Sequence, residues 1–142
     1  MRVRLNRQSL LHDIANLAFV IADIHSEADE HARHQLTDIC QEGNIDRVSR
    51  MMGLAYCIAR ETLKPLRDIK RNTAIRGNCI TLNQLVHEFI VCSVLADWLS
   101  ITIPAAAGVW KEKAQLCMRD ISATVRRMTC EHNILTRKMH PF

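Results

Sequence analysis

Apolar residues along this chain recur at alternating spacings of three and four positions, which is the period of one face of an α-helix. Asn6 or Ser9 can cap the first backbone amides of such a helix, and Gly43 suits a left-handed turn after its last residue. We therefore predict a long first helix over residues 8–41. Its inward face consists of Leu10, Ile14, Leu17, Ile21, Ile24, Ala28, Leu36 and Ile39.

A second helix is predicted over residues 45–76, because the same spacing resumes directly after Asn44. Pro65 has no amide proton to donate to the carbonyl of Glu61, so we expect a kink at this proline. Gly77 and Asn78 should follow the last turn. The inward positions are Ile45, Val48, Met52, Ala55, Ala59, Thr62, Leu66, Ile69 and Thr73.

The third helix is predicted over residues 82–102. Thr81-Leu82-Asn83-Gln84 has the form of a capping box, in which side chains bond to the free backbone amides of a first turn. The segment is apolar nearly all round, which is typical of the most buried helix of a bundle. A fourth helix over residues 105–138 should begin near Pro104 or Gly108. It carries Trp110, Ala114, Cys117, Ile121, Thr124, Met128 and Leu135 at the same spacing.

The composition favours a single all-α domain over residues 1–142. About half of the chain (48%) is hydrophobic, which is enough for one core, and 4 Gly and 3 Pro are too few for the turns of an all-β fold. Helices joined by short loops run antiparallel, so we predict an up-down-up-down four-helix bundle with long helices. A second apolar stripe, if exposed, would allow a homodimer.

The six cysteines favour a reducing environment. They form no CxxC pair, and the first residues lack the apolar stretch of a signal peptide. We expect free thiols in a cytoplasmic protein. The most apolar stretch, residues 89–109, is interrupted by Asp97 and Pro104, so we interpret it as a buried helix and expect no association with a membrane.

Positive charge is concentrated in residues 60–76, which contain six Lys or Arg residues and only two carboxylates. The resulting net charge of +4 equals that of the whole chain. In an antiparallel bundle the start of the first helix lies beside this segment, which predicts a basic pole. We expect this pole to bind an acidic protein partner or, alternatively, the phosphates of a nucleic acid. The candidate residues are Arg60, Lys64, Arg67, Lys70, Arg71 and Arg7.

The residues around His12 resemble a phosphotransfer motif. Leu10-Leu11-His12-Asp13-Ile14-Ala15-Asn16-Leu17 resembles the H-box of histidine-kinase dimerisation and histidine-phosphotransfer hairpins. The resemblance implies that His12 accepts the phosphoryl group, that Asp13 polarises it and that Asn16 supports it. The eight residues depart from the kinase pattern at Ala15 and Leu17, and the chain has no glycine-rich ATP lid. The resemblance therefore implies a phosphotransfer module rather than a kinase.

A metal site is a weaker interpretation of the histidine-rich segment of the predicted first helix. Glu27 and His31 lie one helical turn apart, as do Glu30 and His34. A bundle-core metal centre also needs ligands from facing helices, and the second helix offers only Asp46 near that depth. We therefore expect a solvated surface there and no metal or other cofactor.

A ribonuclease pattern is the last candidate. Arg127 and His132 have the R-x4-H spacing of helical HEPN-type ribonucleases, although Met128 stands where that family usually has a polar residue. Hydrolase, zincin and nucleotide-binding motifs do not occur in the chain. The sequence favours a non-enzymatic interaction protein that uses its basic pole. The alternatives are a histidine phosphotransfer module and a nucleic-acid-binding bundle.

Overall fold

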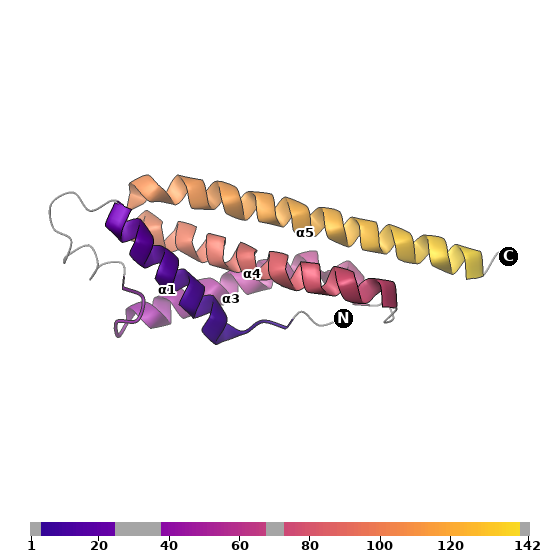
Figure 1. Ribbon diagram of the computed structural model, residues 1–142, viewed down its shortest axis with the longest axis horizontal. Coiled ribbons are helices and arrows are strands. Elements are labelled where there is room, and N and C mark those ends of the chain that lie inside the picture. The colour runs from indigo at the N-terminus through magenta and orange to yellow at the C-terminus, as the bar shows by residue number, and fades with distance from the viewer. Residues whose placement is uncertain (1–3, 25–37, 68–72, 140–142) are drawn as a thin grey trace.

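The structure is a computed structural model that describes residues 4–24, 38–67 and 73–139. In these ranges it contains no strand, so the prediction of an all-α fold is confirmed. The chain order is α1 (Arg7–Ile24), α3 (Asn44–Thr62), the short 3-10 helix η1 (Lys64–Leu66), α4 (Thr73–Thr102) and α5 (Pro104–Met139). Figure 1 shows these helices along the length of the molecule.

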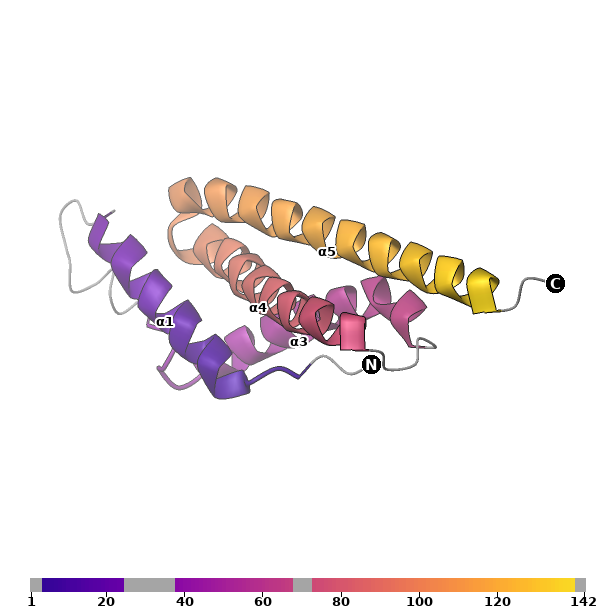
Figure 2. The same cartoon turned by 45° about the vertical axis from the view of Figure 1, so that its right-hand side comes forward.

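Helix α4 is the central element. From Leu82 onward its side chains are buried on nearly every face, as the sequence predicts, and α1, α3 and α5 each pack against the helix (Figure 2). Helices α3 and α5 run antiparallel to α4, whereas α1 crosses it obliquely. The core therefore surrounds one helix. Its largest fully buried α4 side chains are Leu82, Val86, Ile90, Val94, Leu95, Trp98 and Leu99.

Helix α1 packs on α4 through a face that includes the small residues Ala18 and Ala22, which permit a close approach. Asn6 caps the helix, because its Oδ1 accepts a hydrogen bond from the amide of Ser9 at 3.2 Å. The prediction that this helix reaches residue 41 is wrong. Residues 38–43 form turns, in which the carboxylate of Asp38 accepts a hydrogen bond from the amide of Cys40 at 2.9 Å.

Helix α3 ends at Thr62, so the predicted kink at Pro65 is instead the end of the α-helix. Proline cannot donate to the carbonyl four residues earlier, and the chain continues as the 3-10 helix η1. The predicted start of the third helix at Leu82 is also wrong, because α4 already begins at Thr73 and includes Gly77. Helix α5 agrees with its predicted bounds to within one residue at each end.

One described helical segment, Ile80–Thr102 within α4, is long and apolar enough to span a membrane by length and composition. Half of its most apolar window is buried against the other helices. This burial accounts for its apolar character, because the central helix of a helical protein needs apolar side chains on every face.

Candidate functional site

A groove of about 620 Å³ opens between α1, α4 and α5. The groove is open to solvent. Beside it, α1 crosses α4 at an angle (Figure 2). Most of its surface is apolar. The lining residues are Asp13, Asn16 and Leu17 of α1, His87, Glu88, Val91 and Cys92 of α4, and Trp110, Lys113, Leu116, Cys117 and Asp120 of α5.

Helical periodicity explains why these residues meet. Residues three and four apart share a helix face, and each helix contributes such a set to the groove. In α4 the polar pair His87 and Glu88 lies one turn before Val91 and Cys92. The groove therefore has an apolar floor with polar groups along its edges.

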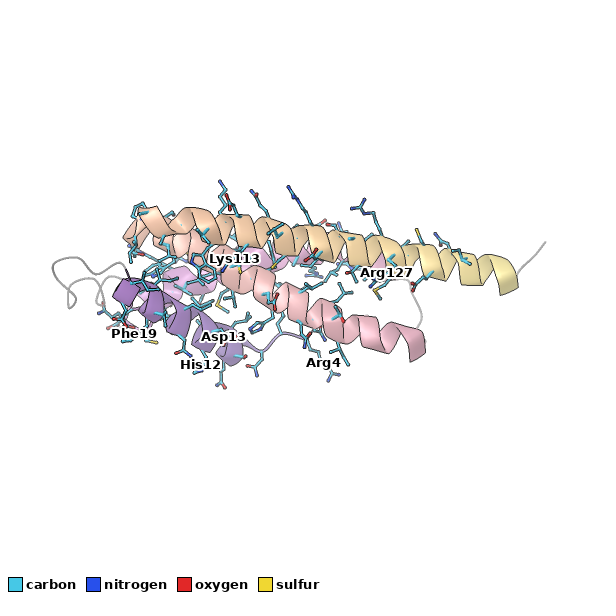
Figure 3. All side chains as sticks on the ribbon, turned by 45° about the horizontal axis from the view of Figure 1, so that its top comes forward. Arg4, His12, Asp13, Phe19, Lys113 and Arg127 are labelled. Atoms are coloured by element: carbon cyan, nitrogen blue, oxygen red, sulfur yellow. The ribbon has the colours of Figure 1, made fainter. Side chains whose placement is uncertain are left out.

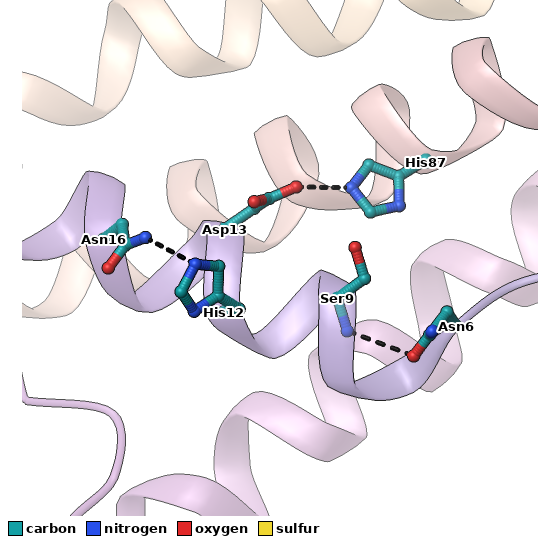
Figure 4. Close-up of polar contacts among 6 residues, drawn as sticks. All are labelled: Asn6, Ser9, His12, Asp13, Asn16 and His87. Carbon is teal, nitrogen blue, oxygen red and sulfur yellow. Dashed lines mark hydrogen bonds and ion pairs between the residues drawn. The ribbon is translucent and has the colours of Figure 1, made fainter.

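Asp13 and His87 join α1 to α4 inside this groove. The Nε2 atom of His87 lies 2.7 Å from Oδ2 of Asp13 (Figure 4). The side chain of His87 is 24% exposed and that of Asp13 is 45% exposed, so water reaches both. This bond fixes the position of α1 against the central helix, in a region where α1 otherwise packs through apolar side chains.

His12 lies on the exposed side of α1, and it does not share Asp13 in the way that the H-box resemblance implies. Successive side chains on a helix point about 100° apart, so Asp13 reaches His87 while His12 points to solvent (Figures 3 and 4). The Nδ2 amide of Asn16 lies 3.0 Å from Nε2 of His12.

The charges around the groove are unequal. The ammonium group of Lys113 lies 4.4 Å from the ring centre of Trp110, in a cation–π contact. Figure 3 shows Lys113 on α5 and Asp13 on α1, on two sides of the groove. Glu88 and Asp120 are exposed, and within the described part of the chain their carboxylates have no hydrogen-bond or ion-pair partner. Among the described residues, two carboxylates and one ammonium group therefore lie at this groove without an ion-pair partner, so the negative charges outnumber the positive one.

Two thiols form part of the groove floor. Burial raises the pKa of the Cys92 thiol to about 11, with a smaller contribution from the adjacent Cys117. Burial also raises the pKa of Cys117, and the carboxylates of Glu88 and Asp120 add to this effect. Both thiols are consequently protonated at neutral pH and behave as small apolar groups rather than as nucleophiles.

The predicted basic pole is not assembled as expected. Arg7 at the start of α1 donates a hydrogen bond to Oγ of Ser49, in the first half of α3, at 2.9 Å. Arg60 lies eleven residues further along α3, roughly 16 Å away along the helix axis. The basic segment of residues 60–76 is also not one continuous helix, because α3 ends before Lys64, and Lys64 pairs with Glu61 at 2.9 Å. Lys70 and Arg71 lie outside the described residues.

Two other candidates fall partly or wholly outside the described residues. The segment with Glu27, His31, Glu30 and His34 is one of them. Where the structure describes the chain, no group of three or more His, Cys, Asp or Glu side chains could hold a metal ion. Of the R-x4-H pair, Arg127 is exposed on α5, and the side chain of His132 is outside the described set.

The groove itself was not predicted from the sequence. Its signal was the pair His87 and Glu88, which interrupts an otherwise apolar helix and marks the side of α4 that faces water. The matching signal on α5 was the spacing of Lys113, Cys117 and Asp120, three and four residues apart. Neither signal shows which helices meet there, since that depends on the crossing of α1 over α4.

Comparisons of this chain with family models, with curated proteins and with solved structures found no match. The site therefore has to be interpreted from its own geometry and charge.

Proposed function

We propose that this protein is a non-enzymatic interaction protein that binds an amphipathic helix of a partner in the groove between α1, α4 and α5. The single observation that carries the proposal is the open apolar groove edged by the unpaired carboxylates of Glu88 and Asp120. Apolar grooves between helices are a common docking site for amphipathic helices. The high thiol pKa values fit a binding surface better than a catalytic one.

The dimensions of the groove suit about three turns of a partner helix. Trp110 and Asp120, at its two ends on α5, are ten residues apart, which corresponds to roughly 15 Å along the helix axis. Leu17, Val91 and Leu116 provide apolar contacts for side chains spaced three and four apart on the partner.

The charged groups of the groove that lack a partner determine which charge the bound helix should carry. Asp13 is bonded to His87, and Lys113 is in contact with Trp110. The remaining carboxylates would attract arginine or lysine residues beside the apolar face of the partner helix. A basic amphipathic helix is therefore the proposed ligand at this surface.

A designed peptide pair tests this function. The first peptide carries leucines at positions i, i+3, i+4 and i+7 flanked by arginines, and the second has the same leucines flanked by glutamates. In a Trp98→Phe variant, Trp110 is the remaining tryptophan and reports on the groove by fluorescence. We expect saturable binding of the arginine peptide and much weaker binding of the glutamate peptide.

Matched charge reversals complete the test. Glu88→Lys and Asp120→Lys should each weaken binding of the arginine peptide, whereas Glu112→Lys, an exposed α5 residue outside the groove lining, should not. Equal losses from Asp120→Lys and Glu112→Lys would contradict a specific site. A fluorescence signal that never saturates would do the same.

A second candidate function is histidine phosphotransfer, which is favoured by the exposed imidazole of His12 and its bond to Asn16. Incubation with acetyl phosphate should then give an acid-labile, base-stable phosphoryl group that is absent from His12→Ala. The variant His87→Ala is the control, because that histidine faces α1. Equal labelling of a folded His12→Ala protein would remove this candidate.

The basic residues Arg60, in the last turn of α3, and Arg67, directly after η1, support a further, separate proposal. Arg60 and Arg67 are exposed and would form the contact surface for an acidic protein or for nucleic-acid phosphates. Binding to either should weaken with salt and drop in the double variant Arg60→Glu, Arg67→Glu. The proposal would be contradicted if retention on DNA, RNA or an acidic polypeptide changed neither with salt nor in the double variant.

We also propose a cytoplasmic location, which the free thiols favour. We also propose that the fold is an up-down-up-down bundle, because α1, α3, α4 and α5 run in alternating directions. It differs from a regular bundle in that α4 is central and α1 crosses it obliquely.

A further inference from the structure

A second groove, separate from the one assigned to the partner helix, lies between α3, α4 and α5. Its volume is about 510 Å³. Ser93 and Ala96 of α4 and Ala107 and Ala114 of α5 line it, and these short side chains leave room for larger ones from another molecule. One side of this groove is α3, through Ile58.

An exposed apolar stripe runs along α3 at the edge of this groove. Leu54 and Ile58 lie one turn apart and are 67% and 54% exposed. Ile58 lines the groove, and Thr62, one turn later, donates a hydrogen bond to the sulfur of Met118 on α5, so Leu54 and Ile58 follow an exposed face of α3 that leads to this groove. Large aliphatic side chains exposed beside an apolar groove are typical of a protein–protein contact surface.

The charges of this face are self-complementary. Asp97 of α4 and Lys111 of α5 line the same groove, both are exposed, and neither side chain is paired within the described residues. A two-fold symmetric dimer brings the same surface of two copies together, so a residue away from the symmetry axis meets a different residue of the other copy, and the contact occurs twice. A face with one acid and one base can thus form two opposite-charge contacts with its own copy.

We propose that two copies of this chain associate through the α3/α4/α5 face as a symmetric homodimer. Leu54 and Ile58 of each copy enter the groove of the other copy, and Asp97 of each copy pairs with Lys111 of the other. The two signs of charge favour a second copy over a partner of uniform charge. The first groove differs in this respect, because its two unpaired carboxylates outnumber its one cation, Lys113, which lies over the ring of Trp110.

A charge-exchange experiment on the full chain, with mass measured by sedimentation equilibrium, tests this dimer. Lys111→Glu alone and Asp97→Lys alone each place two like-charge contacts in the dimer. Each should weaken dimerisation by about a hundredfold, because facing like charges cost several kcal/mol. An equimolar mixture of these two variants should form a heterodimer, and the double variant Asp97→Lys, Lys111→Glu should again form a homodimer.

Apolar variants provide an independent arm. Leu54→Glu should abolish the dimer, while Val109→Glu, at a similarly exposed position of α5 that does not line this groove, should leave it intact. Circular dichroism establishes that each variant is folded. A wild-type chain that sediments as a monomer overturns the proposal, and so does a dimer that withstands both single charge reversals.

Discussion

Asp13 on α1 and His87 on α4 are 74 positions apart in sequence, and their side chains meet at 2.7 Å. This contact connects the obliquely crossing helix to the central one at the edge of the groove. The H-box resemblance assigns Asp13 to its neighbour His12, but the tertiary structure pairs it with a histidine from a different helix. The position of α1, and with it the shape of the groove, depends partly on this bond.

A double-mutant cycle should measure the coupling of Asp13 and His87. Because both side chains are partly exposed, we expect Asp13→Ala to lower the free energy of unfolding by about 1 kcal/mol, with a coupling energy of about 0.5–1 kcal/mol to His87→Ala. Urea unfolding of the two single variants and the double variant gives these values. His12→Ala is the control, since its hydrogen bond lies within α1. Strict additivity of Asp13→Ala and His87→Ala would show that the contact contributes nothing.

Two glycines should respond in opposite directions to the same substitution. Gly43 precedes α3 with φ = 87°, a conformation that costs an alanine about 1 kcal/mol. Gly53 lies inside α3, and an added Cβ would have no atom within 4 Å. Gly53→Ala should therefore raise the free energy of unfolding by about 0.5–1 kcal/mol. Chemical unfolding of the two variants checks both signs, and a stabilising Gly43→Ala would contradict the turn geometry.

The sequence predicted the fold class and the most regular elements correctly. Helix α4 is apolar on nearly all faces, and this pattern identifies a central helix even when its neighbours are not known. Pro104 fixes the start of α5, because a proline is tolerated in a first turn. Gly43 was expected to be left-handed, and it is, although it precedes α3 instead of ending a long first helix.

The errors arose where a local signal competed with tertiary packing. Thr81-Leu82-Asn83-Gln84 has capping side chains, but α4 continues through them because Leu82 is fully buried in the core. The apolar spacing continued past Pro65, although the missing amide ends α3. Periodicity also shows which face of a helix is buried, but it does not show which other helix covers that face. The crossing of α1 over α4, and the groove beside it, could therefore not be predicted.

Asn83 does not cap a helix as predicted, and the buried oxygen of its side chain destabilises the folded protein. Its Oδ1 atom is buried within α4 and has no hydrogen-bond partner among the described residues. An unsatisfied buried acceptor costs about 1–3 kcal/mol, so Asn83→Leu should raise the free energy of unfolding by about 1 kcal/mol. Thermal and urea unfolding measure this change. Gln84→Leu at the adjacent exposed position is the control and should have little effect. A destabilised Asn83→Leu protein would indicate that the amide oxygen is satisfied in solution.

Alkaline pH should destabilise the protein through Cys92. Its thiol ionises at its ordinary pKa of 9.0 in the unfolded chain and at about 11 in the folded protein, so the folded state binds more protons between these values. Stability from this group is complete below pH 9 and is lost as pH rises towards 11. Urea unfolding across this range should show a shallower decline in Cys92→Ala than in wild type, whereas Cys40→Ala, at an exposed thiol, should keep the wild-type slope. Iodoacetamide should label the exposed Cys40 and Cys57 before the buried Cys92. Equal rates at all three would contradict the burial of the Cys92 thiol.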